Sequence, residues 1–304
     1  MPRHLKGILG LLIVTMVWGT TFPAMKDLSQ HFSASWILFL RFAIGGLVLI
    51  PFLLRAKKAD WLGGGMLGAL LFVAAMFQFS GLVLTSSNRN AFVTGLNVLI
   101  VPLLGLAAGK LPEKRILVAI ALAIVGLFAL CWDGAAWGEG DNLALMGAFC
   151  FGAYVKMLEV TSRRASSLMA MTTVQILAVA LCALLWLMFR ELPAHPFFWD
   201  EFLAAGRASF FNLAYLSLVA TAAIISLQTW GQHHASANEA AVIYAFEPGC
   251  AAIAAYFWLG ESMGLRGLVG AALLIGGMIV SQWTPENKPQ APQASGNAPE
   301  GTPG

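Results

Sequence analysis

The chain has 304 residues, of which 59% are hydrophobic and only 11% are charged, and its formal net charge is +3. A soluble domain carries about 25% charged residues, so this composition excludes an ordinary water-facing surface and indicates an integral membrane protein in a lipid bilayer. The positive charges are few and scattered, which argues against a nucleic-acid groove, and no nucleic-acid partner is expected.

Apolar runs of about 20 residues recur along the chain, each long enough to cross a hydrocarbon core of about 30 Å. The predicted membrane-spanning helices are 7–26, 35–54, 62–84, 89–109, 115–132, 143–162, 168–189, 209–231, 239–259 and 264–283. The first run follows Arg3 and Lys6, as in a signal peptide, but no small-residue cleavage site follows it, so we interpret it as the first helix. Residues 284–304 are rich in proline and polar residues and are predicted to be a disordered cytoplasmic tail.

Identical residues recur at an offset of 150 along the chain. The pairs are Gln78/Gln228, Gly81/Gly231, Ser86/Ser236, Asn88/Asn238, Ala91/Ala241, Ala121/Ala271 and Gly126/Gly276. Each copy holds five predicted helices, and an odd number forces the second copy to cross the membrane upside down. The predicted fold is therefore all-α, with ten transmembrane helices in two inverted five-helix repeats, residues 1–134 and 143–283. Inverted repeats are typical of secondary transporters.

The loop charges predict the orientation in the membrane. Segments on the side of the N-terminus hold eleven Lys and Arg residues, and those on the other side hold five. Because positively charged loops stay in the cytoplasm, both termini are expected there.

Several short motifs carry a family resemblance over about residues 7–283. Trp18-Gly19-Thr20-Thr21-Phe22, Leu40-Arg41-Phe42, Phe246-Glu247-Pro248 and Leu259-Gly260-Glu261 resemble elements of the drug/metabolite transporter superfamily, in particular its EamA-type members. The resemblance implies a bacterial inner-membrane carrier, often an exporter of amino acids or other small metabolites. One departure is Asn97, which stands where the offset places Glu247, so the two halves are chemically unequal.

Glu247 lies about eight residues into the ninth predicted helix, near the membrane midplane, where an ionisable group is costly and is a candidate for function. Pro248 lacks a backbone N–H and obstructs the preceding turn, so we expect the helix to bend or open at Glu247. The carboxylate would bind a cationic substrate group, or take up and release a coupled proton. The alternative is a structural glutamate that anchors helix packing. No other cofactor is expected.

Three further charged side chains within predicted helices are Arg41, Lys156 and Glu159. The guanidinium of Arg41 would bind a substrate carboxylate through two hydrogen bonds. Alternatively, it binds backbone carbonyl groups at a helix end, or its side chain extends along the helix to the membrane surface. Lys156 and Glu159 are three residues apart on one helix face, where they form an ion pair; alternatively, Lys156 faces the cavity. Tyr154 projects from another side of that helix and is a further candidate for substrate contact.

Gln78 and Gln228 are polar identities that the repeat preserves, and each offers donors and an acceptor suited to a zwitterion. Interhelical hydrogen bonding is the alternative. Asn88 and Asn238 lie at predicted helix starts, and we interpret them as N-caps.

Trp18 and Tyr244 fall on helices that line the cavity in the resembling family, where aromatic rings suit an apolar, aromatic or cationic substrate. An interfacial belt is the usual alternative. His233 and His234 are adjacent and so point about 100° apart on a helix, which favours an interfacial pair. The four cysteines lie in apolar runs without metal-ligand spacing, and no metal site is expected.

The fifth and tenth predicted helices are nearly free of polar groups, and the tenth holds Gly270, Gly276 and Gly277. Small residues permit close helix contact, so this pair is expected to brace the periphery or to form a homodimer surface.

Three classes of function are weighed. The repeats, the midplane polar groups and the proline-bent helix favour a secondary carrier that exports small metabolites, such as amino acids or related compounds, by alternating access. The alternative function is an efflux carrier of cationic drugs. An intramembrane enzyme lacks support, since no HExxH or GxSxG motif occurs, and a channel or sensor is less favoured because the polar groups do not form continuous rings. The predicted substrate contacts are Trp18, Arg41, Gln78, Tyr154, Lys156, Gln228, Tyr244 and Glu247.

Overall fold

The computed structural model describes residues 3–104, 114–131, 136–191 and 209–282, and within these ranges every regular element is helical. The helices of the first half are α1 (Arg3–Leu28), α2 (Ala34–Leu49), η1 (Ile50–Arg55), α3 (Lys58–Leu84), α4 (Ser87–Gly95), α5 (Asn97–Leu103) and α6 (Lys114–Cys131). Those of the second half are α7 (Glu139–Arg164), α8 (Leu168–Trp186), η3 (Leu187–Glu191), α10 (Phe210–Ala214), η5 (Tyr215–Ala223), α11 (Ile224–His234), α12 (Ala237–Tyr244), α13 (Glu247–Leu259) and α14 (Leu265–Gln282). The predicted tail lies outside the described residues.

Seven helices of the described part are long and apolar enough to span a membrane, judged by length and composition. They are Arg3–Leu28, Ala34–Arg55, Lys58–Leu84, Glu139–Arg164, Leu168–Glu191, Phe210–His234 and Glu239–Leu259. Shorter apolar stretches lie within α6 (Leu117–Gly126) and α14 (Leu265–Val280). The chain is thus a multi-pass helical membrane protein.

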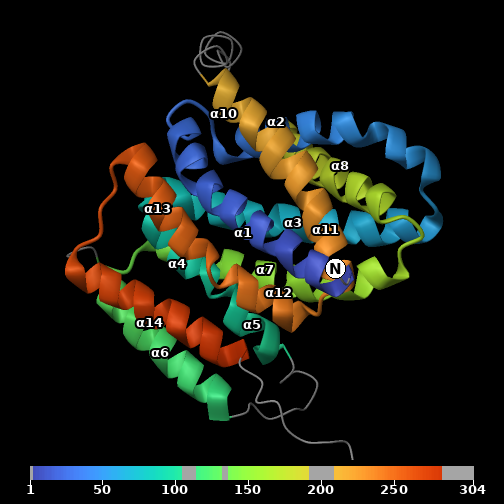
Figure 1. The fold of residues 1–304 in the computed structure, drawn as a ribbon. Helices are drawn as coiled ribbons and strands as arrows, with labels where there is room; N and C mark the ends of the chain where they lie inside the picture. Colours follow the sequence, from blue (N-terminus) through green and yellow to red (C-terminus); the bar gives the residue numbers. More distant parts are fainter. Residues whose placement is uncertain (1–2, 105–113, 132–135, 192–208, 283–304) are drawn as a thin grey trace, which may run out of the picture.

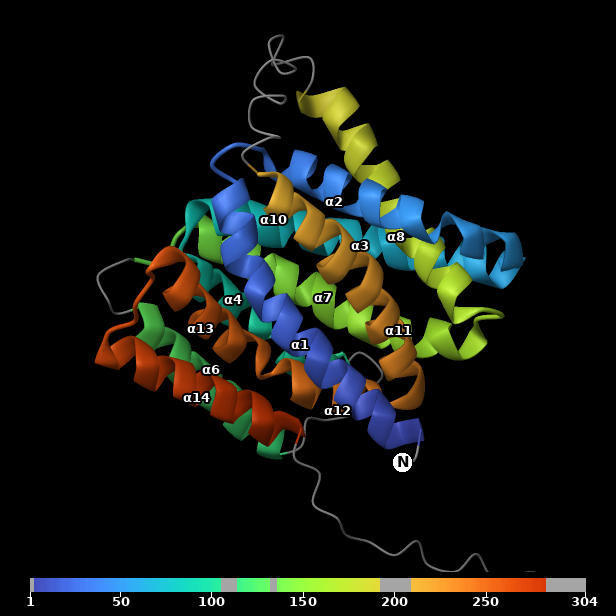
Figure 2. The same cartoon turned by 45° about the horizontal axis from the view of Figure 1, so that its top comes forward.

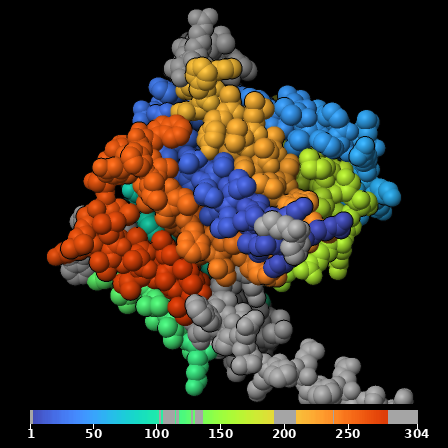
Figure 3. Space-filling view, viewed as in Figure 1, coloured from blue at the N-terminus to red at the C-terminus, as the bar shows by residue number. Residues whose placement is uncertain are grey.

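The helices pack as a central bundle with one pair at its side (Figures 1 and 2). α3 packs on α7 and α8, and α2 packs on α8, while α1 crosses the front of the bundle against α11 and α13. In the space-filling view, α1 lies between these two helices (Figure 3). α6 and α14 lie side by side at one edge of the bundle.

Two predicted spans are interrupted at positions 150 residues apart. The predicted span 239–259 is divided into α12, which ends at Tyr244, and α13, which begins at Glu247 with Pro248 as its second residue. This confirms the expected opening at Glu247. The predicted continuous span 89–109 is wrong, because α4 ends at Gly95 and α5 begins at Asn97. The two breaks touch: a Cβ added at Gly95 would lie 2.6 Å from Cγ of Pro248.

The prediction that Asn88 and Asn238 are N-caps is also wrong. The N-caps are Ser86 and Ser236, whose hydroxyls accept hydrogen bonds from the backbone N–H groups of Arg89 and Glu239 at 3.2 Å. Serine satisfies the free N–H groups of a helix start as well as asparagine does. The helices begin at Ser87 and Ala237, two residues earlier along the chain than the predicted spans that start at 89 and 239.

Small residues bring α6 and α14 together. A Cβ at Gly126 would lie 2.7 Å from the carbonyl oxygen of Gly270, and one at Gly277 would lie 2.8 Å from that of Ala119. These glycines are used in the contact between the two helices. The homodimer surface predicted for this pair stays a prediction.

Candidate functional site

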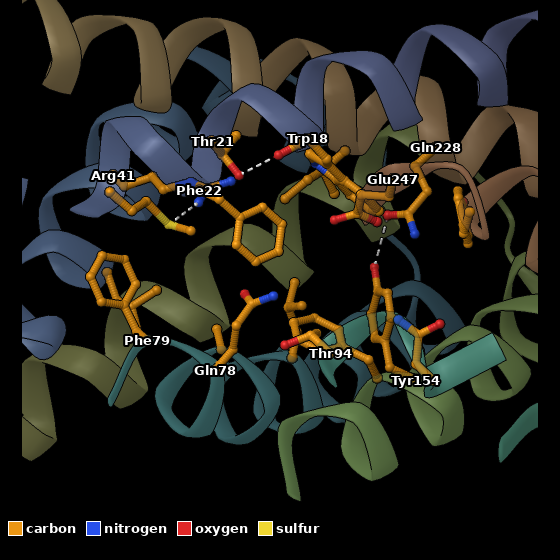
Figure 4. Close-up of a pocket in the computed structure, with 18 of the residues that line it drawn as sticks. Trp18, Thr21, Phe22, Arg41, Gln78, Phe79, Thr94, Tyr154, Gln228 and Glu247 are labelled. Carbon is orange, nitrogen blue, oxygen red and sulfur yellow. Dashed lines mark hydrogen bonds between the residues drawn. The ribbon is translucent and has the colours of Figure 1, made fainter. Parts of the chain in front are cut away.

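A cavity lies at the centre of the bundle, walled by side chains from both halves of the chain. Its aromatic lining residues are Trp18, Phe22, Phe42, Phe79, Phe151, Tyr154 and Tyr244, and its other polar ones are Thr21, Arg41, Gln78, Thr94, Asn97, Gln228 and Glu247. Figure 4 shows Arg41 at one end of the cavity, Glu247 and Gln228 towards the other, and the ring of Phe22 between them. The cavity volume is about 70 Å³, which is room for roughly five water molecules.

Seven of the eight predicted substrate contacts line this cavity: Trp18, Arg41, Gln78, Tyr154, Gln228, Tyr244 and Glu247. Lys156 does not. Its ammonium pairs with the Glu159 carboxylate at 2.5 Å, and its side chain is 52% exposed. Tyr154 and Lys156 are two residues apart on α7 and so point about 200° apart. Because Tyr154 points into the cavity, Lys156 points away from it.

Glu247 occupies the helix opening. It is the first residue of α13, where the unpaired N–H groups of a helix start favour a negative charge. Within the described part of the chain, its carboxylate makes no hydrogen bond and no ion pair. A cavity-lining carboxylate in this state can accept hydrogen bonds from a cation, a proton donor or water.

Arg41 is in the opposite situation, since the protein already binds its guanidinium. Nε donates to Oγ1 of Thr221 at 2.6 Å, Nη2 donates to the carbonyl oxygen of Ala220 at 3.3 Å, and Nη1 contacts Sδ of Met25 at 3.3 Å. These contacts fasten α2 to the π-helical segment η5. Arg41 therefore contributes positive charge to the cavity while most of its bonding serves the fold.

A chain of buried amides and phenols runs along one side of the cavity. Nε2 of Gln175 donates to the Tyr154 hydroxyl at 2.8 Å, and that hydroxyl donates to Oε1 of Gln228 at 3.2 Å. Nε2 of Gln228 and the Tyr244 hydroxyl both donate to Oε1 of Gln232, at 3.3 and 3.4 Å. The network joins side chains of α7, α8, α11 and α12 beside the cavity.

The rings of Trp18 and Tyr244 form an aromatic wall of the cavity that Glu247 also lines. Their centroids are 5.7 Å apart and their planes are tilted by 41°. Such rings attract a cation through their negative faces. A cationic group held by Glu247 would therefore lie beside favourable aromatic surface.

Sequence reasoning missed Thr94, Asn97 and Gln232 as site residues. The offset of 150 would have found two of them, because Thr94 corresponds to Tyr244 and Asn97 to Glu247, and all four line the cavity. Gln232 lies one turn after Gln228 on the same helix face.

His233 and His234 bind backbone carbonyl oxygens of Ser162 and Trp230 at 3.2 and 2.9 Å. No metal-binding group of three or more His, Cys, Asp or Glu residues occurs in the described ranges.

Comparison with known proteins identifies the family. The model of the EamA-like transporter family matches residues 5–132 and again residues 138–282. Two relatives from Archaeoglobus fulgidus, each named an uncharacterized transporter, are 28% and 24% identical, covering 81% of this chain in both cases and 75% and 85% of their own lengths. One solved crystal structure of a protein has a TM-score of 0.63 at 19% identity, covering 91% of this chain and 95% of the other, and so shares the fold. The chain therefore belongs to the EamA-like transporter family, and it is a multi-pass membrane transporter.

Proposed function

We propose that the protein is a secondary carrier that exports small metabolites across the bacterial inner membrane by alternating access. Ten membrane crossings in two inverted repeats, residues 1–134 and 143–283, would be the seven long helices, α6, α14 and the broken pair α4–α5. The two helix breaks 150 residues apart, both against the cavity, support this arrangement. With both termini in the cytoplasm, α4 and α7 would begin on the outer side.

The observation that carries the proposal is the state of Glu247. Its carboxylate lines the central cavity at a helix opening and has no protein partner within the described residues. Glu247 is half-buried, and a charge withdrawn from water without a partner is costly, so a ligand or a proton is expected to neutralise it. We expect substrates with an amino group, such as amino acids and related amines, with a proton competing for the same carboxylate.

A carrier of larger cationic compounds is the second candidate, favoured by the aromatic wall of Trp18 and Tyr244. The cavity volume of about 70 Å³ favours smaller substrates in this conformation. Size is therefore the property that separates the two candidates.

The test is flux in proteoliposomes with radiolabelled lysine, phenylalanine and tetraphenylphosphonium, with and without a pH gradient. We expect saturable flux of an amino acid, and its loss in Glu247→Gln at normal expression, since the amide keeps the shape but not the charge. The matched control is Glu139→Gln, an exposed position at the start of α7, which should transport normally. Unchanged flux in Glu247→Gln would remove Glu247 from the mechanism. If the pH gradient has no effect on net accumulation, the carrier is facilitative rather than proton-coupled.

A further inference from the structure

Helix α4 is polar and yet completely buried. All nine of its residues are buried, and five of them are polar or charged: Ser87, Asn88, Arg89, Asn90 and Thr94. Four buried atoms on it have no hydrogen-bond partner in the described part of the chain, namely Ser87 Oγ, Asn88 Oδ1, Asn90 Oδ1 and Thr94 Oγ1. Most buried polar groups in proteins are hydrogen-bonded, so four exceptions on one short helix require an explanation.

Three of these residues form a stripe along the helix. Ser87, Asn90 and Thr94 follow the spacing i, i+3, i+7, which places them on one face over about 10 Å. At the C-terminal end of the stripe, Thr94 lines the central cavity. Asn97 follows at the start of α5 and lines the same cavity. The stripe therefore leads away from the cavity towards the start of α4.

The other end of the stripe lies beside a second cleft. The lining residues of this cleft include Lys26, Ser86, Asn88, Arg89 and Glu261. Its walls combine these charged and polar residues with the apolar Val83, Leu84 and Met263. A row of unpartnered polar atoms thus extends between two hollows that a substrate could occupy.

We propose that the face of α4 carrying Ser87, Asn90 and Thr94 is the wall of the substrate route between the central cavity and this cleft. The proposal rests on the proposed carrier function and adds the route to it. When the helices separate, the unpartnered atoms bind the substrate and its water as it passes. In the proposed orientation the cleft is on the outer side, so this is the exit route of an exporter.

Two charged side chains hold this end of the route closed. Nζ of Lys26 donates to the carbonyl oxygens of Leu82 at 2.7 Å and Thr85 at 2.8 Å, at the end of α3. The Glu261 carboxylate accepts from the backbone N–H groups of Ser87 at 3.0 Å and Asn88 at 3.1 Å, at the start of α4. Both residues come from outside the α3–α4 turn, so release of either would free the turn to move.

The first experiment compares hydroxyl removals. Ser87→Ala and Thr94→Val delete hydroxyls without a partner, so a merely structural α4 should keep or gain stability. We expect the thermal midpoint to be unchanged or higher, while transport falls by about fivefold or more, the effect of losing about one hydrogen bond to the moving substrate. The matched control is Thr172→Val on α8, whose buried hydroxyl donates to the Leu168 carbonyl away from the cavity. Equal transport in Thr94→Val, Ser87→Ala and Thr172→Val would overturn the proposal.

The second experiment maps access directly. Single cysteines are introduced by Ser87→Cys, Asn90→Cys and Thr94→Cys in a chain without its native cysteines. The control is Phe92→Cys, a buried position on the opposite face of α4. A membrane-impermeant methanethiosulfonate should label the three stripe positions from the cleft side only, and a transported compound should slow labelling at Thr94→Cys. If the unlabelled protein transports but the stripe cysteines react no faster than the control, the route is wrong and the carrier function stands. If the wild type gives no flux, the proposed function fails, whatever the labelling pattern.

Discussion

Glu247 and Arg41 line the same cavity and carry opposite charges, but they differ in the number of hydrogen bonds that the protein makes to them. The guanidinium of Arg41 is bound by Thr221, Ala220 and Met25, whereas Glu247 makes no hydrogen bond or ion pair in the described residues. A residue whose bonds are used by the fold cannot release them without cost, but an unpartnered carboxylate can change its partner at each turnover. We therefore assign substrate or proton exchange to Glu247 and a positioning role to Arg41.

A buried ion pair joins α4 to α7 close to the proposed route. The Asp141 carboxylate accepts from Nε and Nη2 of Arg89 at 2.6 and 2.7 Å, and from the backbone N–H of Gly138 at 2.8 Å. The two side chains are 4% and 10% exposed. The pair fixes the start of α4 against the start of α7.

Asp141→Asn should therefore lower stability strongly. The neutral amide removes the negative charge that Asp141 places beside the buried guanidinium of Arg89, and breaking such a pair costs about 3–5 kcal/mol. The thermal midpoint of the purified protein in detergent measures the effect. Glu139→Gln, two residues earlier and exposed, should leave the midpoint unchanged; equal midpoints for the two variants would show that the pair does not stabilise the fold.

At the scale of elements, close helix contacts depend on individual glycines. Gly277 and Gly276 are neighbours on α14, but only Gly277 faces α6, where an added Cβ would lie 2.8 Å from the Ala119 carbonyl oxygen. An added Cβ at Gly276 meets no described atom within 4 Å. The two positions therefore form a matched pair with the same helix and the same mutation.

Gly277→Ala should destabilise the protein, because the backbone of Ala119 cannot move aside cheaply, whereas Gly276→Ala should be neutral or stabilising by up to about 1 kcal/mol through helix propensity. The midpoints of thermal unfolding of both variants test this. A midpoint for Gly277→Ala at or above that of Gly276→Ala would contradict the described contact between α6 and α14.

Some helix boundaries could be predicted from the sequence, and others could not. The opening at Glu247 was predictable, because Pro248 disrupts the preceding turn by itself. The break at Leu96 was not, because no proline lies at that point and the contact of Gly95 with Pro248 exists only in the folded chain. The π-helical segment η5 likewise has no sequence signal, and its binding of Arg41 is a tertiary contact.

The site was predictable in its charged members and less so in its polar ones. Glu247 and Arg41 stood out because ionisable groups at membrane depth are rare. Lys156 met the same criterion but lies outside the cavity, since membrane depth does not fix the direction in which a side chain points around its helix. Thr94 carries no charge, and the only sequence signal for it is its correspondence to Tyr244 at the offset of 150. Gln232 also carries no charge, and its place in the hydrogen-bond network depends on its neighbours in space.

At the scale of the whole molecule, the two halves supply equivalent positions with unequal chemistry. Gln78 and Gln228 are identical, but Asn97 faces the cavity where the other half places Glu247. The acidic partner for a substrate thus comes from the second half, whereas the first half supplies the positive charge of Arg41. We expect that half to hold the substrate while the first half, through α4, provides the route out.

The central claim is that the cavity is exposed to the two sides of the membrane in turn, and counterflow tests it most directly. Proteoliposomes are loaded with an unlabelled compound from the flux panel that the protein transports, and the same compound is added outside in radiolabelled form at trace concentration. An alternating-access carrier should exchange inner for outer molecules, so the label should rise transiently above its equilibrium level in the wild type and not in Glu247→Gln. A label that rises only to equilibrium, without an overshoot, would show a channel-like path and contradict alternating access.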